Sequence, residues 1–463
     1  MKKNSAVGSQ PVTRLIWILL AVFFVIIVVH LAKRDFNHDE FEAVHTAWKI
    51  QQGEKIFVDF FQHHHPFYYY MLIPVLVIFG QTITAVFAMR FISLVMLALM
   101  LFVTYRLSLT IFNNKQSALI SVLLLSGALI FINRAIEIRP DVPQTLLSLA
   151  SLFLLFDYLE KKRRLNLVLS AVFLAASFLF LQKAVFLIAL IGLLLLICAY
   201  KKRVSFTDVF IYSIALLVSV LPYFVYLVCS GTLSTYLTFN WLLNMKFLHH
   251  FTAFEALGYA VLTNTLLCVF YCWGLLKFSK KPQPNRIGWM SLALLGSVFL
   301  VRAPYKQYFM IVIPLMAIIA ANAVWQLFAT RVKWLVAVLM LSTLPPALFL
   351  LNRLKENNAA QIEKINYVLS ITGPQDFVYD GKAAFNLFRK DIDYFWFSVR
   401  LNRALETYQT MTQYNYDIYE LIEKFRPKII SDCQIQNIRH EAVASDYIQS
   451  DKFENLFIRK NDL

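Results

Sequence analysis

The chain has 463 residues, of which 59% are hydrophobic and 16% are charged, and its mean hydropathy is +0.59. Soluble domains are nearer to half apolar and a quarter charged, so this composition predicts a polytopic membrane protein. The net charge of +16 is uneven, because residues 352–463 carry 15 Lys and Arg against 16 Asp and Glu. A basic excess confined to the apolar part is typical of cytoplasmic loops and not of a nucleic-acid-binding surface. The sequence contains no Walker A loop and no GxGxxG motif, so an ATP-driven pump and a nucleotide-sugar Rossmann domain have no support.

Apolar segments recur from residue 15 to residue 351, most of them about as long as a helix needs to cross the hydrocarbon. The predicted spans are residues 15–32, 85–105, 117–132, 142–158, 166–181, 184–200, 209–228, 258–276, 287–301, 309–328 and 334–351. With residues 1–14 in the cytoplasm, the dense basic clusters at 161–164 and 201–203 also face the cytoplasm, as the positive-inside rule requires. We therefore expect a multi-pass protein of the inner (plasma) membrane, with its amino terminus inside and its carboxyl terminus outside.

The segment 66–80 is apolar but too short to cross the membrane comfortably, and it contains Pro74. We interpret it as an interfacial or re-entrant helix, and the alternative is a short second span. The flat placement keeps the basic cluster at 161–164 inside, so it is favoured. Residues 33–84 then form an outer loop.

The last 112 residues, 352–463, change character. Short apolar runs at 377–379, 428–430 and 456–458 alternate with helical stretches such as 417–426, the pattern of a small α/β domain. The expected fold class is thus an all-α polytopic membrane domain at 15–351, with about 11 transmembrane helices, followed by a soluble extracytoplasmic α/β domain.

The longest polar segment before this tail is residues 35–70, which holds six acidic residues and five histidines. Asp39 and Glu40 follow the first span closely, at the height of the lipid headgroups, where a carboxylate can accept a proton from a hydroxyl. The alternative is helix capping, with Asn37 or Asp39 as the N-cap and Glu40 in the first turn. Spacing alone leaves both interpretations open.

A second polar site lies on the outer side at residues 133–141, NRAIEIRPD. Asp141 begins a predicted helix, so it either caps that helix or adds a second carboxylate to a functional site. Arg134 and Arg139 carry guanidinium groups, whose planar forks match phosphate oxygens. Their alternative role is to extend to lipid headgroups.

Three consecutive histidines, His63, His64 and His65, allow a metal site that His249 or His250 of another outer loop would complete. Consecutive side chains cannot all point the same way, and no His-x-x-x-His pair accompanies them. We therefore expect no cofactor, and a divalent metal ion is the less favoured alternative.

Several short motifs follow one another in a fixed order along residues 15–330. An Asp-Glu pair follows the first span, a polar loop ends in a Pro-aromatic-Tyr-Tyr helix, and Arg90 opens the next span. They continue with RPDVP at 139–143, Gln182-Lys183, and YKQYFMIVIP at 305–314. This order resembles the GT-C glycosyltransferases, and within them the group of protein O-mannosyltransferases, lipid A aminoarabinose transferases and rhizobial galacturonosyltransferases.

The resemblance implies an inverting glycosyltransferase that moves a sugar from a polyprenyl phosphate to a lipid, glycan or protein acceptor at the outer face. It implies that Asp39, with Glu40 beside it, is the base or acceptor-orienting carboxylate, and that Asp141 is the second acidic residue. Many relatives carry a lysine where this chain has His65, so the donor phosphate could be bound by several other cations. The residues implied for that phosphate are His65, Arg134, Arg139, Lys183, Arg302 and Lys306.

The resemblance also implies a sugar or lipid groove lined by Tyr68, Tyr69 and Tyr305, for which an interfacial aromatic belt is the alternative. A different function, a membrane carrier or a flippase of a lipid-linked saccharide, predicts acidic residues or Gly and Pro breaks inside the spans. Such residues are sparse in the predicted spans, which favours the transferase. Expected partners are the lipid-linked sugar, the acceptor and membrane lipids, without nucleic acid.

Overall fold

The computed structural model describes residues 9–246, 252–277, 282–302, 304–355, 357–381, 384–397, 404–412, 417–431 and 440–462. Its contacts divide the chain into two compact units. The first contains Met1–Ala32, Arg90–Val225 and Phe251–Lys355, and the second contains Lys33–Met89, Tyr226–His250 and Glu356–Leu463. The domain boundary at 351/352 remains a prediction.

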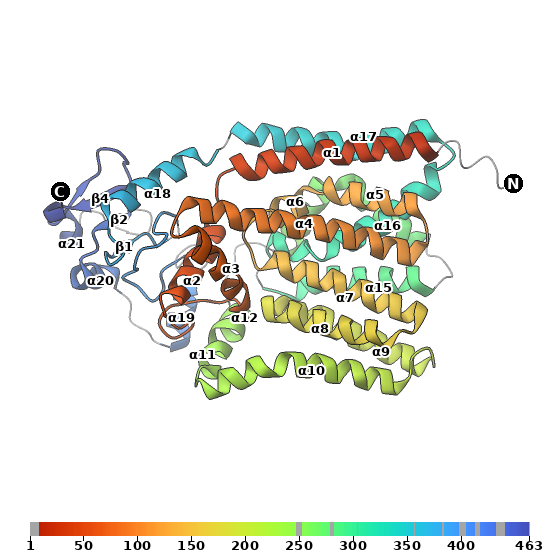
Figure 1. Cartoon of the computed structure of the whole chain (residues 1–463), viewed down its shortest axis with the longest axis horizontal. Coiled ribbons are helices and arrows are strands. Elements are labelled where there is room, and N and C mark those ends of the chain that lie inside the picture. The colour runs from red at the N-terminus through yellow and green to blue at the C-terminus, as the bar shows by residue number, and fades with distance from the viewer. Residues whose placement is uncertain are drawn as a thin grey trace. The chain divides into compact units, whose positions relative to one another are not determined.

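The first unit is helical, and Figure 1 draws its long helices nearly parallel to one another. Its longer helices, in chain order, are α1 (Ser9–Lys33), α4 (Ile83–Phe112), α5 (Lys115–Ser126), α6 (Leu129–Ala135), α7 (Asp141–Lys161), α8 (Arg164–Phe180), α9 (Val185–Tyr200), α10 (Phe206–Cys229), α13 (Ala253–Thr263), α14 (Thr265–Leu276), α15 (Pro282–Ser297), α16 (Val312–Phe328) and α17 (Val332–Asn352). The short turns are η1 (Gln182–Ala184), η3 (Val298–Leu300), η4 (Lys306–Phe309) and η5 (Arg353–Lys355).

Six helices in the described part of the chain are long and apolar enough to cross a membrane, or up to eight if each of two bent pairs is one span. The bent pairs are α5 with α6, at 72°, and α13 with α14, at 100°. The predicted number of about eleven spans is therefore not confirmed. The bends fall within the predicted spans 117–132 and 258–276, and α8 and α16 are helices of 17 residues each.

The core of the first unit is built around α16, which packs against α5 and α14. Nearly all its residues from Val312 to Val324 are buried. A Cβ atom on Gly274 of α14 would lie 2.7 Å from Ile319 Cγ2, so glycine is what permits this approach. Gly127, at the bend after α5, meets the same limit, since its Cβ would lie 2.4 Å from the Ser342 carbonyl oxygen.

Arg90 is buried at the start of the first unit's part of α4 and is satisfied by the end of another helix. Its Nη1 donates to the Leu31 carbonyl oxygen at 2.8 Å, in the last turn of α1. A helix leaves its last carbonyls without partners, and they carry the negative end of the helix dipole, so a guanidinium group is well suited to this position.

The second unit combines helices with a small sheet. Its helices are α2 (His38–Gln51), α3 (Phe67–Phe79), α11 (Leu233–Leu237), the π-helix η2 (Thr238–Leu243), α12 (Asn244–Lys246), α18 (Ala359–Ile371), α19 (Ala404–Thr412), α20 (Ile418–Phe425), α21 (Glu441–Ala444) and η7 (Lys460–Asp462). The strands are β1 (Val378–Tyr379), β2 (Ile429–Ser431), β3 (Tyr447–Gln449) and β4 (Leu456–Arg459).

The sheet has the order β1-β2-β4-β3, with β1 parallel to β2 and the other pairs antiparallel. Strands β1, β2 and β4 confirm the three apolar runs that the sequence indicated, and α20 confirms the helix at 417–426, with Asp417 as its N-cap. β3 was not predicted, because its pattern of one buried and two exposed residues gives little periodicity. The expected α/β character of the tail is confirmed.

Candidate functional site

Asp141 is the first residue of α7, and Pro140, not Asp141, occupies the N-cap position. The capping alternative for Asp141 is therefore wrong. The Asp141 side chain is only 5% exposed, and its Oδ1 accepts from Lys183 Nζ at 2.9 Å. Arg139 Nε lies 3.5 Å from the other carboxylate oxygen, so two cations meet one buried acid in the first turn of a helix.

Glu137 extends this network and was given no role in the sequence analysis. It is buried, and its carboxylate accepts from Arg134 Nη1 at 2.8 Å and lies 3.3 Å from Arg139 Nη1. Arg139 is therefore paired inside the protein and does not extend to lipid headgroups, whereas Arg134 is partly exposed at 23%. Three cations and two carboxylates form one continuous row of ion pairs from Arg134 to Lys183, and the row has a formal charge of +1.

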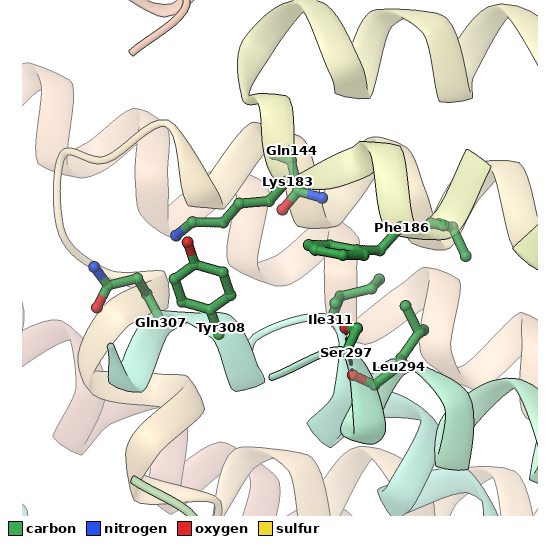
Figure 2. A pocket seen from close by; sticks show the side chains of 9 residues that line it. Gln144, Lys183, Phe186, Leu294, Ser297, Gln307, Tyr308 and Ile311 are labelled. Atoms are coloured by element: carbon green, nitrogen blue, oxygen red, sulfur yellow. Dashed lines mark hydrogen bonds between the residues drawn. The ribbon is translucent and has the colours of Figure 1, made fainter. Parts of the chain in front are cut away.

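A small pocket opens beside the Lys183 end of this row of ion pairs (Figure 2). Gln144, Lys183, Ser297, Gln307 and Tyr308 form its polar wall. Phe186, Leu187, Leu294 and Ile311 form its apolar wall. Binding sites commonly combine apolar walls with a few convergent polar groups, and this pocket has that composition.

Lys183 extends its amino group over the ring of Tyr308, and Nζ lies 4.1 Å from the ring centroid (Figure 2). Burial, and then the Asp141 carboxylate, raise the pKa of the Tyr308 hydroxyl. The phenol therefore stays protonated at neutral pH and can donate a hydrogen bond. A cation and a neutral donor thus face the same space.

Lys306 and Arg302, which were also predicted for the donor phosphate, are not among the residues that line this pocket. Lys306 is exposed, with Nζ 3.7 Å from the centroid of the Tyr259 ring, and Arg302 is exposed as well. Tyr305 precedes η4 and is half-buried. The structure therefore brings together Arg134, Arg139 and Lys183 around Asp141.

In the second unit, Glu40 and Asp39 have different surroundings. Asn37 is the N-cap of α2, and Glu40 closes the capping box, since its Oε2 accepts from the Asn37 N–H at 2.9 Å. The capping interpretation is thus confirmed for Glu40, which is fully buried. Asp39 is half-exposed at 30%, and its Oδ1 lies 2.9 Å from His38 Nε2, so its carboxylate is open to solvent on one side.

Glu42, on the same helix, belongs to a buried hydrogen-bond network. Gln62 Nε2 donates to Glu42 Oε1 at 2.9 Å and to Thr46 Oγ1 at 3.1 Å, and Tyr69 donates to the same Glu42 oxygen at 3.4 Å. Tyr68 and Tyr69 are both buried. In the second unit, these two rings pack into the interior and do not form an open wall.

The rings of His63 and His64 lie 4.0 Å apart between centroids, whereas His65 contacts Tyr236. His65 is buried, and its Nε2 lies 3.0 Å from the Tyr236 hydroxyl, which also accepts from Trp241 Nε1 at 3.1 Å. His63 and His64 donate their backbone N–H groups to Gln62 Oε1. No group of three or more His, Cys, Asp or Glu side chains among the described residues is arranged to hold a metal ion. His249 and His250 lie outside the described residues.

A further buried cluster in the second unit was missed by the sequence analysis. Asp391 Oδ2 accepts from His45 Nε2 at 2.7 Å and from Lys49 Nζ at 3.1 Å, and Glu54 lies 3.0 Å from the same Lys49 atom. Burial alone would raise the pKa of Asp391, but His45 and Lys49 outweigh it and hold the pKa below its ordinary value. No local pattern marks Asp391, because its partners are about 340 positions away.

Comparisons with known proteins agree with this architecture. Residues 63–228 match the family model described as dolichyl-phosphate-mannose-protein mannosyltransferase. No curated protein matches the chain by sequence.

Solved structures match over most of the chain at low sequence identity. The crystal structure of ArnT from Cupriavidus metallidurans bound to undecaprenyl phosphate has a TM-score of 0.72 at 12% identity, covering 97% of this chain and 98% of that one. Its apo form gives 0.68 at 15% identity, with 91% and 93% covered. The Archaeoglobus fulgidus oligosaccharyltransferase in its apo form gives 0.59 at 13% identity, with 89% and 69% covered. The chain therefore shares the fold of these solved structures, and its residues 63–228 resemble the mannosyltransferase family model.

Proposed function

We propose that the chain is an inverting glycosyltransferase that moves a sugar from a polyprenyl-phosphate donor to a hydroxyl of a lipid, glycan or protein acceptor at the outer face of the membrane. The observation that carries the proposal is the pocket in which Lys183, paired with Asp141, and the neutral Tyr308 phenol face an apolar wall. A lipid phosphate has the matching composition, an anion joined to a hydrocarbon. The fold similarity to an ArnT structure that contains undecaprenyl phosphate supports the same assignment.

The phosphate end of the donor needs cations more than it needs a general acid, because a phosphate is already a good leaving group. Lys183 is the cation at the pocket, and Arg139 and Arg134 follow it along the carboxylate chain. Charge-assisted hydrogen bonds to an oxyanion are about twice as strong as neutral ones. We propose secondary roles for His65, Lys306 and Arg302 in holding this anion.

In the transfer step, the acceptor oxygen forms a bond to the anomeric carbon while the bond from that carbon to the phosphate oxygen breaks. The bonding pair leaves with the polyprenyl phosphate, and the acceptor proton passes to a carboxylate. Asp39 suits this base, because its carboxylate is partly solvent-accessible whereas Glu40 is occupied by the helix cap. Asp141 serves as the acid that orients Lys183. The proposed step uses no metal ion, because cationic side chains meet the phosphate charge.

The proposed topology places the amino terminus in the cytoplasm and residues 352–463 outside, with about eleven spans in an inner or plasma membrane. The dense basic clusters then lie on the cytoplasmic side. On this arrangement, the helix α3 lies in the outer interface with its Tyr68–Tyr70 end toward the polar loop.

The proposal is tested by separating donor binding from transfer. Lys183→Met should weaken the binding of undecaprenyl phosphate to the purified protein in nanodiscs by about tenfold or more, because one charge-assisted contact is lost. Lys201→Met, at an exposed position, is the matched control and should leave binding unchanged.

Asp39→Asn should bind undecaprenyl phosphate as the wild type does but lower transfer by about a hundredfold or more, since base catalysis is removed. Transfer is read as the loss of a sugar from envelope glycans, by mass spectrometry of a deletion strain complemented with each variant. Wild-type transfer by Asp39→Asn, or wild-type binding by Lys183→Met, would refute the corresponding assignment.

A further inference from the structure

Residues 386–397 pass along the buried side of α2 and carry Asp391 into contact with it. Both contacts of the Asp391 Oδ2 atom come from α2, one from His45 at 2.7 Å and one from Lys49 at 3.1 Å. Asp391 and His45 are 3% and 0% exposed, so this is a buried charged interaction within the second unit. The other Asp391 oxygen accepts from Asn386 Nδ2 at 2.7 Å, which fixes the carboxylate in turn.

Neighbouring residues of the same segment hold the loop that follows α2. The Trp396 ring lies 4.6 Å from the His45 ring, and its Nε1 donates to the Phe61 carbonyl oxygen at 3.1 Å. The Tyr394 hydroxyl donates to the Phe57 carbonyl oxygen at 2.9 Å, and the Tyr394 carbonyl accepts from the Phe61 N–H at 2.9 Å. These bonds tie residues 57–61 to residues 394–396.

The segment just before α2 is also held by hydrogen bonds to its backbone. These bonds come from residues just before and within α18. Gln361 makes two bonds to the backbone of Phe36, at 2.7 and 3.0 Å, and the Asn358 N–H donates to the Lys33 carbonyl oxygen at 3.0 Å. Thus residues after position 356 clamp the polar loop both before and after α2. The loop does not depend on its own short-range contacts alone.

The two contacts on Asp391 fix the rotation of α2 about its axis. His45 and Lys49 are four residues apart and so lie on one face, while Glu42 and Thr46 form a second face that binds Gln62. With two faces held and the first turn closed by the Asn37–Glu40 capping box, the direction of every Cα–Cβ bond in that turn is determined. Asp39 belongs to this turn.

Buried ion pairs contribute little net stability, because the cost of removing two charges from water offsets their attraction. Breaking one of them leaves a buried charge without its partner, which is costly. Such a pair therefore contributes more to fixing one orientation of α2 than to the free energy of unfolding.

We propose that Asp391 is a positioning residue for the acceptor-activating Asp39, acting through His45 and Lys49 of α2. The inference rests on the proposed function for the role of Asp39. It gives the carboxyl-terminal segment a part in the reaction, because that segment supplies the acid that sets the orientation of the catalytic helix.

The test compares Asp391→Asn with Ile422→Ala, a buried core residue of the second unit in a cluster without α2 residues. Both substitutions should lower the melting temperature. Only Asp391→Asn should speed amide hydrogen exchange of residues 38–51, by about tenfold or more. It should also lower transfer by a similar factor while the binding of undecaprenyl phosphate stays unchanged. Wild-type exchange in 38–51 and wild-type transfer in Asp391→Asn would overturn the proposal.

A second variant addresses the case in which Asp391→Asn fails to fold. Replacing all three groups by apolar ones (His45→Leu, Lys49→Met and Asp391→Leu) removes the buried charges together, which commonly preserves stability. We expect a melting temperature near that of the wild type with transfer still reduced, because the register is no longer specified. Recovery of transfer along with stability would show that the cluster is merely structural.

The proposed function and the positioning role fail in different ways. If the wild-type protein does not bind undecaprenyl phosphate and deletion of the gene leaves envelope glycans unchanged, the proposed function falls. Hydrogen exchange of residues 38–51 needs no substrate, so it still decides whether Asp391 fixes α2.

Discussion

A single carboxylate, that of Glu137, holds both guanidinium groups of the 133–141 loop. Arg134 and Arg139 would bind a phosphate well if they were free of this partner, so Glu137 lowers the positive charge that an incoming anion meets. It also keeps Arg139 in place beside Asp141. Glu137 therefore has two opposite effects. It holds the arginines in position, and it lowers the affinity of the site for an anion.

Glu137→Gln should raise the affinity for undecaprenyl phosphate by roughly three- to tenfold, because a negative charge near the anion is removed. It should also lower the melting temperature, since Arg134 and Arg139 both lose a carboxylate partner and only Arg139 keeps another, Asp141. Affinity is measured on purified protein in nanodiscs at two salt concentrations, and the gain should shrink at the higher one.

Glu160→Gln, on the exposed last turn of α7, is the control and should change neither quantity. A weaker affinity in Glu137→Gln would contradict this account, because it would mean that Glu137 chiefly orients the arginines.

Side-chain contacts were predictable where the two partners are close together in the sequence. A helix cap at Asn37 or Asp39, with Glu40 in the first turn, was one of two interpretations of this spacing, and the capping box of Asn37 and Glu40 confirms it. The pairing of Asp141 with Lys183 joins positions 42 apart, so the sequence offered both residues but not their contact. Glu137 was overlooked although it stands between two selected arginines, because a lone acid in a loop has no characteristic spacing.

At the scale of elements, α2 and the segment 386–397 share one charged cluster. In this cluster the pKa of the acid Asp391 is lowered and the pKa of the base Lys49 is raised. The folded protein holds the pKa of Asp391 below its ordinary value of 3.8. Burial lowers the pKa of Lys49, but Asp391 and Glu54 outweigh it and raise that pKa above its ordinary 10.5. The cluster's contribution to stability is therefore present between these two limits.

We expect the melting temperature of the purified protein to fall as the pH drops below about 4, because the unfolded chain binds the Asp391 proton first. Above about pH 10 it should fall again, because the unfolded chain releases the Lys49 proton first. The groups that face one another in this cluster are His45, Lys49, Glu54 and Asp391.

Thermal unfolding is compared between the wild type and Asp391→Asn across pH 3 to 7. The variant should show a smaller decline on acidification, since it lacks the titrating carboxylate. Parallel curves for the two proteins would contradict the assignment.

The elements of the carboxyl-terminal tail were largely predictable, because short buried strands such as β2 and β4 are apolar runs between polar segments. The bends after α5 and α13 were not predicted. Gly127 follows α5 where a side chain would strike the Ser342 carbonyl, and Asn264 separates α13 from α14. Hydropathy measures how apolar a segment is and not whether its axis is straight, so both were predicted as continuous spans.

For the whole molecule, the positive-inside rule predicts the direction in which the chain crosses the membrane. A periplasmic reporter enzyme fused after Arg353 should be active, and a cytoplasmic reporter at the same position inactive. The matched fusion at Lys201, in a predicted cytoplasmic cluster, should give the reverse pattern. A cytoplasmic signal after Arg353 would invert the proposed topology and remove the outer-face assignment.

The overall fold class was predictable because composition and the order of motifs act over the whole chain. The GT-C fold and the mannosyltransferase-like family match agree with the resemblance carried by Asp39-Glu40, Arg139–Pro143 and Gln182-Lys183. The association of residues 33–89 with residues after 356 was not predictable, because it depends on pairs such as Phe36 with Gln361, 325 positions apart.

The distance between His45 and Asp391 along the chain has a consequence for biosynthesis. Lys49 leaves the ribosome 342 residues before its acid partner, which corresponds to about 17 to 70 s at ordinary rates of translation. For that time Lys49 has Glu54 of its own loop as a partner but lacks Asp391, so the buried cluster can form only when synthesis is almost finished. We expect a truncated product that ends before Asp391 to be degraded faster than the complete protein, because the acid that pairs with His45 and Lys49 is missing.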